Sequence, residues 1–230
     1  MSADERGWDG LFLWDHVDYR APVSAVADPW VALAAVASAS ARIRLGPMVT
    51  PLSRRRVPKL ARETVTLDLL SRGRLTLVVG LGSDRNDELA PYGEVVDPRE
   101  RARLLDEGLE RLAGFWAGGF EPRPVQSPRI PVWVAGRWPA RRPLRRAARW
   151  DGFFPIDLNG PEALAELGEE LARLRSEAGR EGHFDLVVEL PPGGAEYSSW
   201  EQAGASWILT AFGPQPRQQE VREVIEGGPR

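Results

Sequence analysis

Short apolar runs alternate along this chain with longer amphipathic segments. Each apolar run has the length of a β-strand, and most are continuously apolar instead of alternating. That pattern is typical of strands covered on both faces by other elements. Seven runs are predicted as strands, over residues 11–15, 43–50, 75–80, 132–135, 152–156, 185–189 and 206–211.

Helical periodicity fills the intervals between the runs. Asp28 followed by Pro29 matches an N-cap with proline in the first turn, and Asp97 followed by Pro98 repeats the signal. Gly73 is placed to end the second helix. The predicted helices cover 29–41 and 58–71, follow Asp97, start at Pro139 and at Pro161, and end with a weaker one over 216–225.

Unbroken strand–helix alternation predicts right-handed βαβ units and a parallel sheet. Two closures are compatible with it, an open doubly wound sheet and a (β/α)8 barrel. The first strand is followed by Asp-His-Val-Asp at 15–18, which is no glycine fingerprint for a dinucleotide. Glycines follow later strands instead, at Gly80, Gly82 and Gly136. We therefore expect one domain over 1–230, an α/β TIM-type barrel that is incomplete because seven strands are predicted.

Composition narrows the class of protein. The chain has 230 residues, of which 43% are hydrophobic, enough for a sizeable core. A net charge of -3 does not favour nucleic acid or an anionic membrane as partner. The absence of cysteine excludes disulfides and thiolate chemistry. No apolar run has the length of a membrane span or a signal peptide, so we expect a cytoplasmic location.

An acid and an imidazole, Asp15 and His16, stand side by side at the end of the first predicted strand. Carboxyl ends of parallel strands are where ligand sites form, and imidazole titrates near neutrality. From the residues alone, an acid–base role and local packing are about equally well supported. Ser-His-Asp hydrolysis is disfavoured because the chain has no GxSxG turn. No metal-ligand constellation is visible, and composition leaves paired-carboxylate glycosidase chemistry open.

Several phrases occur together in one order along the chain: GWDG at 7–10, DH at 15–16, IRLG at 43–46, VTP at 49–51, TLDLLSRGR at 66–74, GLG at 80–82, VWVAG at 132–136 and DG at 151–152. Over nearly the whole chain this pattern resembles the bacterial luciferase-like superfamily. That resemblance implies a TIM barrel and an oxidoreductase or monooxygenase dependent on FMN or coenzyme F420. It also implies a small organic substrate. A barrel that lacks one strand exposes two sheet edges, so we expect a homodimer, although an unusual closure could cover the edges as well.

The chain departs from that family at three places. Members usually have a first strand and a full helix before the phrase at 7–10, where this chain has what resembles the last turn of that helix at 3–6. The family usually carries a longer excursion between Trp116 and Pro124. Asp84 stands where many relatives have a further glycine. These departures are compatible with a truncated gene model, an incomplete barrel, or a trimmed relative that has lost catalysis.

The resemblance assigns roles to the residues at the strand ends. His16 is the expected general acid/base, with Asp15 as its partner or as a contact to the cofactor ring. Thr50 is expected to place its hydroxyl or amide against that ring, although it equally well ends a strand. Gly80 and Gly82 would let the ring approach the backbone, or they serve turn geometry alone. Asn86 and Glu88 follow in the loop and could contact a cofactor tail or the substrate, but isolated polar loop residues of this kind are more often solvated, and we interpret them so.

A phosphate cradle is expected where the strand at 132–135 ends. Gly136 turns the chain, Arg137 lies at the turn, and Pro139 is expected to start a helix whose free amides face the site. Trp138 either covers the flavin or stacks between helix and loop. The arginines within that helix are read as its outer face. Trp14 and Trp133, both in strands, are read as core or as site wall.

Three functional hypotheses follow. The first is a luciferase-like oxidoreductase that uses FMN or F420 on a small organic substrate. The second is a non-catalytic flavin-binding or dimer-partner barrel of the same origin. The third is a fragment that does not fold alone.

Overall fold

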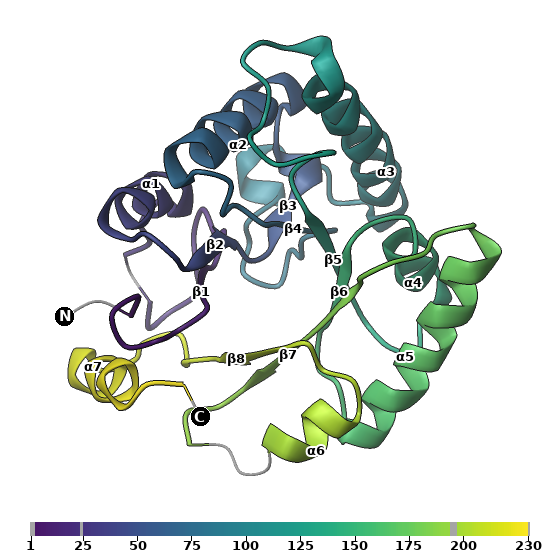
Figure 1. The fold of residues 1–230 in the computed structure, drawn as a ribbon. Coiled ribbons are helices and arrows are strands. Elements are labelled where there is room, and N and C mark those ends of the chain that lie inside the picture. The colour runs from purple at the N-terminus through teal and green to yellow at the C-terminus, as the bar shows by residue number, and fades with distance from the viewer. Residues whose placement is uncertain (1–2, 24, 194–196, 230) are drawn as a thin grey trace. The chain divides into compact units, whose positions relative to one another are not determined.

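The computed structural model describes residues 3–23, 25–193 and 197–229. The chain divides into two compact units, residues 1–131 and 132–230. In both units, parallel strands alternate with helices along the chain (Figure 1). All seven predicted apolar runs contain strands.

Unit 1 carries four strands with helices between them in its described residues. Its elements are β1 (Gly10–Leu13), α1 (Pro29–Ala39), β2 (Arg44–Pro47), β3 (Thr50–Pro51), the 3-10 turn η1 (Leu52–Arg54), α2 (Val57–Ser71), β4 (Leu77–Gly80), the 3-10 turn η2 (Ala90–Tyr92), α3 (Pro98–Gly114) and the π-helical turn η3 (Phe115–Gly119). β1 pairs with β2 and β3 with β4, both in parallel.

The predicted helix starts are confirmed by their caps. The Asp28 carboxylate accepts a hydrogen bond from the Val31 amide at 2.9 Å, and Asp97 accepts one from the Arg99 amide at 3.0 Å. At the end of α2, Gly73 takes a φ of 81° and its amide donates to the Asp68 carbonyl.

The prediction of one continuous strand over 43–50 is wrong. The segment forms β2 and β3, separated by Met48 and Val49, whose peptide bond is cis. The physical reason is a change of partner: the Met48 amide still donates to Leu13 of β1, whereas Thr50 is paired with Val79 of β4. An apolar run does not reveal which neighbour each half will pair with.

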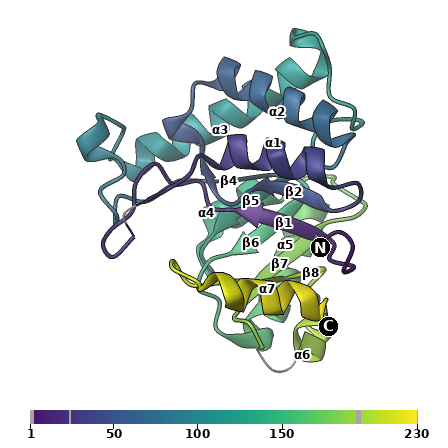
Figure 2. The same cartoon turned by 90° about the vertical axis from the view of Figure 1, so that its left-hand side faces the viewer.

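The core of unit 1 lies between its strands and three helices. α1, α2 and α3 lie on the same side of β1, β2 and β4 (Figure 2). Leu33, Leu60 and Leu109, one from each helix, are at most 1% exposed. Trp116 is buried as well, and its indole N–H donates to the Thr64 hydroxyl at 3.0 Å. Helix packing therefore fixes the positions from which the strand ends project.

Unit 2 is a four-stranded parallel sheet with helices between the strands. Its elements are β5 (Val132–Gly136), α4 (Arg141–Ala147), β6 (Gly152–Pro155), α5 (Gly160–Glu177), β7 (Asp185–Leu190), α6 (Tyr197–Gln202), β8 (Trp207–Thr210) and α7 (Gln218–Gly227). The strands pair in chain order, β5 to β8. The predicted leucine stripe of α5 is buried, at Leu164, Leu167, Leu171 and Leu174.

Two helix starts in unit 2 differ from the prediction, and α6 has no counterpart among the predicted helices. The helix expected at Pro139 begins at Arg141, because residues 137–140 form a turn closed by the Ala140 amide on the Arg137 carbonyl. The last helix begins at Gln218 and not at 216. α6 covers six residues of mixed polarity, too short for a periodic signal.

One acid joins the amino-terminal ends of three strands in unit 2. The Asp185 carboxylate accepts hydrogen bonds from the Trp133 indole at 3.0 Å and the Ser206 hydroxyl at 2.9 Å, and contacts His183 Nε2 at 2.8 Å. This end of a parallel sheet serves stability. None of the helices in the described part of the chain combines the length and apolar composition that a membrane span requires.

Gly46 of β2 tests the packing of unit 1. A Cβ at this position would lie 2.0 Å from the Thr76 carbonyl oxygen, a backbone atom that cannot turn aside. We expect Gly46→Ala to lower the free energy of unfolding by roughly 1–3 kcal/mol, measured by chemical denaturation. The matched control is Gly114→Ala in α3, where a Cβ meets nothing within 4 Å and is expected to stabilise by about 0.5–1 kcal/mol. Equal effects of the two substitutions would contradict the close packing around Gly46.

Candidate active site

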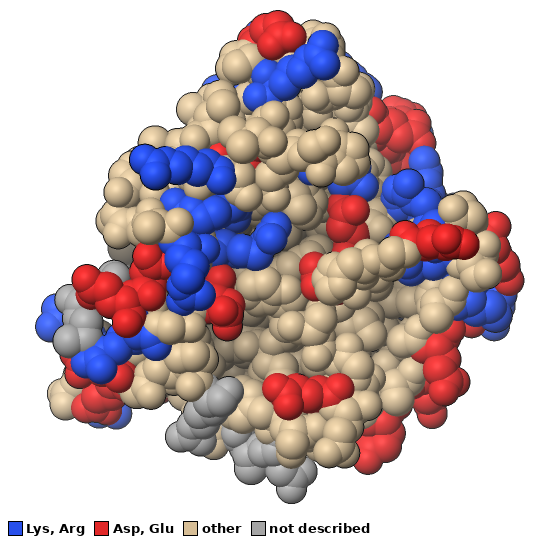
Figure 3. Space-filling view, in the orientation of Figure 1, with Lys and Arg blue, Asp and Glu red and all other residues tan. Residues whose placement is uncertain are grey.

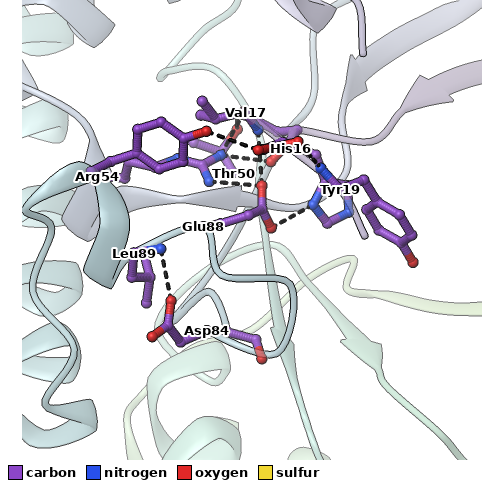
Figure 4. A network of polar contacts seen from close by, with 12 residues as sticks. His16, Val17, Tyr19, Thr50, Arg54, Asp84, Glu88 and Leu89 are labelled. Carbon is purple, nitrogen blue, oxygen red and sulfur yellow. Dashed lines mark hydrogen bonds and ion pairs between the residues drawn. The ribbon is translucent and has the colours of Figure 1, made fainter. Parts of the chain in front are cut away.

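The carboxyl ends of β1, β3 and β4 bring distant parts of unit 1 together. β1 leads into Asp15 and His16, β3 leads into η1 with Arg54, and β4 leads into the loop that carries Glu88. Figure 4 shows side chains from these three segments joined in one polar network. The network lies where a parallel α/β fold places its functional residues.

His16 is paired with Glu88 in this network. Its Nδ1 lies 2.7 Å from Glu88 Oε2. The other oxygen, Oε1, accepts hydrogen bonds from the Val17 amide at 2.9 Å and from Arg54 Nη1 at 3.2 Å. The Glu88 side chain is 6% exposed and the His16 side chain 28% exposed. The carboxylate is therefore enclosed while the imidazole remains accessible.

Arg54 connects the two acids of the network. Its Nη2 donates to the Asp15 carbonyl oxygen at 2.7 Å and to Asp15 Oδ1 at 3.2 Å, while Nη1 donates to Glu88. The side chain is 5% exposed. Because a guanidinium is planar and always charged, one residue fixes both carboxylates relative to each other.

Asp15 is buried and its carboxylate is fully engaged. Oδ1 also accepts from Arg55 Nη2 at 2.5 Å, and Oδ2 accepts from the Thr50 hydroxyl at 2.8 Å and the Trp30 indole at 3.3 Å. These contacts tie the end of β1 to α1, β3 and η1. They describe an anchoring residue, and the expected role of Asp15 as a ring contact stays a prediction.

The electrostatics of the network favour an ionised Glu88. Burial raises the pKa of the carboxyl group. The hydrogen bonds from His16 and the Val17 amide, together with the charges of His16 and Arg54, lower the pKa by more than burial raises it. The net effect is a pKa below the ordinary value of 4.5. Two carboxylates facing two guanidiniums leave no uncompensated charge when His16 is neutral.

The loop that carries Glu88 is held by its own acid. Asp84 Oδ1 accepts from the Leu89 amide at 2.7 Å and from the Ala90 amide at 3.2 Å. The Asp84 side chain fixes the backbone next to Glu88 (Figure 4).

The other predicted residues of unit 1 lie around this network and have structural roles of their own. Thr50 is fully buried, and its hydroxyl donates a hydrogen bond to the Asp15 carboxylate. Gly80 ends β4 and is paired with Pro51. Gly82 has a φ of 71°, and a Cβ added to it would lie only 2.8 Å from Pro51 Cβ. Glycine is thus required at 82 by the close approach of Pro51, whatever else binds there.

Unit 2 holds the residues predicted as a phosphate cradle. Gly136 ends β5, and a Cβ there would lie 2.4 Å from Pro143 Cβ, so glycine permits α4 to pack on β5. Arg137 is exposed and ion-paired with Asp157. Trp138 is half-buried. α4 has only seven residues, and the cradle stays a prediction.

Sequence reasoning misses the partners of the expected acid/base. It treats Glu88 as a solvated loop residue and does not single out Arg54 or Arg55. The pairing of His16 with Glu88 joins residues 72 positions apart, so no local pattern marks it.

Positive and negative side chains lie close together on the face seen in Figure 3. Lys and Arg side chains gather over part of unit 1 there, with Asp and Glu side chains beside them. Along α5, Arg173 pairs with Glu170 and Glu177. Such exposed pairs contribute little to stability or recognition.

Comparison with known proteins identifies the family to which this fold belongs. Residues 2–223 match the family model described as luciferase-like monooxygenase. The chain belongs to the luciferase-like monooxygenase family. The resemblance inferred from the sequence is therefore confirmed.

Among luciferase-like relatives, the chain is 31% identical over 211 residues to the phthiodiolone/phenolphthiodiolone dimycocerosates ketoreductase of Mycobacterium sp. (strain JLS). The match covers 83% of this chain and 54% of that protein, so the chain spans about half the length of this curated relative.

Two solved luciferase-like structures define the fold. An F420-dependent secondary alcohol dehydrogenase, in complex with an F420–acetone adduct, superposes with a TM-score of 0.79 at 16% identity, covering 97% of this chain and 89% of that chain. The oxygenating constituent of 3,6-diketocamphane monooxygenase from Pseudomonas putida, in complex with FMN, gives 0.65 at 18% identity over 81% and 58%. The predicted fold class, an α/β chain of the TIM-barrel type, is confirmed.

The pH dependence of stability tests the charge of Glu88. Because its pKa is lowered on folding, the ionised carboxylate contributes stability above pH 4.5 that is lost as the pH falls through the folded value. We expect the excess stability of the wild type over Glu88→Gln to shrink progressively below pH 4.5, measured by urea denaturation between about pH 3 and 7.

The matched control is Glu94→Gln, which removes a charge from the same loop outside the network. Its difference from the wild type is expected to change little over that range. A constant difference between the wild type and Glu88→Gln at all pH values would contradict the lowered pKa.

Proposed function

We propose that this protein is an oxidoreductase that uses FMN or coenzyme F420 to interconvert a small organic carbonyl compound and its alcohol. His16 acts as the general acid/base, and Glu88 orients it. The observation that carries this proposal is the contact of 2.7 Å between His16 Nδ1 and the buried Glu88 carboxylate at the carboxyl end of β1.

The pair defines which nitrogen handles the proton. An ionised Glu88 accepts only, so the neutral imidazole carries its hydrogen on Nδ1 and presents the lone pair of Nε2. When Nε2 takes up a proton, the Glu88 carboxylate stabilises the resulting imidazolium. Nε2 can therefore receive a proton from an alcohol or return one to a carbonyl oxygen.

Arg54 keeps this arrangement fixed during the reaction. Its bond to Glu88 Oε1 holds that carboxylate ionised, and its bonds to Asp15 hold the end of β1 in place. Neither acid has to reorganise when the charge on His16 changes. Preorganised partners of this kind lower the cost of moving a proton.

The carboxyl end of β4 supports the binding of a flat cofactor ring. Gly80 leaves the backbone there without a side chain, Pro51 fills the space beside Gly82, and both Pro51 and the neighbouring Leu81 are apolar. Such a stretch admits close approach of a planar ring. When bound, FMN or F420 supplies the hydride chemistry, which no side chain of the network provides.

The relatives support a carbonyl–alcohol reaction. One is named a ketoreductase and another a secondary alcohol dehydrogenase, names that describe the same type of interconversion in opposite directions. FMN and F420 both occur among the names of the solved neighbours. The proposal carries this reaction class to the present chain and leaves the choice between the two cofactors to measurement.

Replacing His16 tests its role directly. We expect His16→Ala to lower kcat for ketone reduction about 10²–10⁴-fold because proton transfer is lost, while cofactor affinity stays within a factor of a few. The matched control is His183→Ala, the other histidine of the chain, which lies at the amino-terminal end of β7 and should keep full activity. Unchanged turnover in His16→Ala would refute the acid/base role.

Cofactor binding is tested on the purified protein. We expect FMN or F420 to co-purify or to bind on addition, identified by mass spectrometry and by its visible absorption. A protein that holds the cofactor yet turns over no ketone or alcohol would instead support the non-catalytic flavin-binding alternative.

A further inference from the structure

Trp14 is exposed although it is the largest apolar side chain at the end of β1. Of its surface, 44% is accessible to solvent. Its ring meets the His16 imidazole edge to face, with centroids 5.7 Å apart and planes at 79°. A large exposed aromatic ring beside an acid/base residue is more informative than an exposed aliphatic side chain would be.

Tyr19 adds a third ring to this pair. Its ring is stacked with Trp14 at 5.9 Å and 26°, and stands at 80° to His16 at 4.9 Å. The Trp14 and Tyr19 rings therefore stack on each other, and the imidazole stands nearly perpendicular to both, beside the pair. In Figure 4 the Tyr19 ring lies beside His16, on the side away from Arg54.

The three rings are held in place by the segment after β4. Asp18 accepts hydrogen bonds from the Tyr19 amide at 2.7 Å and from the Tyr92 hydroxyl at 2.9 Å. The bond to Asp18 raises the pKa of Tyr92, so the phenol stays protonated and keeps donating. Together with the contacts of Glu88 to His16 and Val17, these bonds hold the three rings in position.

Two hydrogen-bond donors of the cluster are available to a ligand. Within the described residues, neither the Trp14 indole N–H nor the Tyr19 hydroxyl is engaged in a hydrogen bond. Oxygen acceptors on the edge of a flat ligand would satisfy both donors.

We propose that Trp14, His16 and Tyr19 form the binding site for a flat conjugated carbonyl group of the substrate, such as an aryl ketone. The assignment rests on the proposed function for its reaction and goes beyond it in naming the substrate class. The conjugated ring packs against the Trp14 and Tyr19 rings, and the carbonyl oxygen faces His16. A saturated ring of equal size buries similar apolar area but lacks the aromatic contact.

Two ketones of matched size test this proposal: acetophenone and cyclohexyl methyl ketone. We expect the wild-type protein to bind acetophenone roughly two- to tenfold more tightly, measured by calorimetry or by tryptophan fluorescence in the absence of turnover. Trp14→Leu is expected to abolish that preference, and Trp14→Phe to retain most of it. Trp200→Leu, which alters a half-buried tryptophan of α6, is the matched control and should keep the preference.

Three results would overturn the assignment. In the first, the wild type binds both ketones with equal affinity. In the second, a folded Trp14→Leu variant keeps the preference of the wild type. Either result would mean that the three rings only pack the loop. In the third, saturating FMN or F420 abolishes acetophenone binding, which would mean that the three rings bind the cofactor instead of the substrate. These binding measurements are independent of the His16→Ala turnover experiment, so failure of one proposal is distinguishable from failure of the other.

Discussion

The guanidinium of Arg54 is the constraint on which the candidate site depends. One planar cation reaches the carbonyl and carboxylate of Asp15 on one side and the carboxylate of Glu88 on the other. The three residues come from the ends of β1, β3 and β4, so their side chains can meet only when the carboxyl ends of those strands lie close together. A buried cation between two acids is favourable only with good geometry. Both Nη atoms of Arg54 bond to the acids, while its buried Nε has no hydrogen-bond partner among the described residues. The arrangement of the site is thus a property of the folded unit.

Division of labour between the two acids follows from their surroundings. Asp15 has four side-chain donors around its carboxylate and serves as an anchor for the end of β1. Glu88 keeps one oxygen for His16 and gives the other to the Val17 amide and Arg54. Two carboxylates at similar depth therefore have different roles, because one holds the backbone and the other holds the imidazole. The adjacent residues of the Asp-His phrase consequently belong to different parts of the site.

Local signals are sufficient to predict most of the fold. The Asp28 and Asp97 caps are predictable because an acid before a proline acts within one turn, and the leucine stripe of α5 follows from helical period. The break between β2 and β3 is not predictable, since it reflects a change of pairing partner and not a change of composition. The same limit explains the site. His16 is identifiable from its place at a strand end, whereas Glu88 and Arg54 acquire their roles from contacts that no spacing along the chain encodes.

Asp185 of unit 2 has a structural role, in contrast to the acids of the candidate site. By gathering the Trp133 indole, the Ser206 hydroxyl and His183 at the amino-terminal ends of β5, β7 and β8, it secures those strands far from their carboxyl-terminal loops. Loops at the opposite ends are thereby relieved of holding the sheet together. Insertions, deletions and new side chains can accumulate in them without unravelling the strands. Proteins that share such a sheet can evolve different chemistries by changing the loops at the carboxyl ends of the strands, while the hydrogen-bonded amino-terminal ends stay the same.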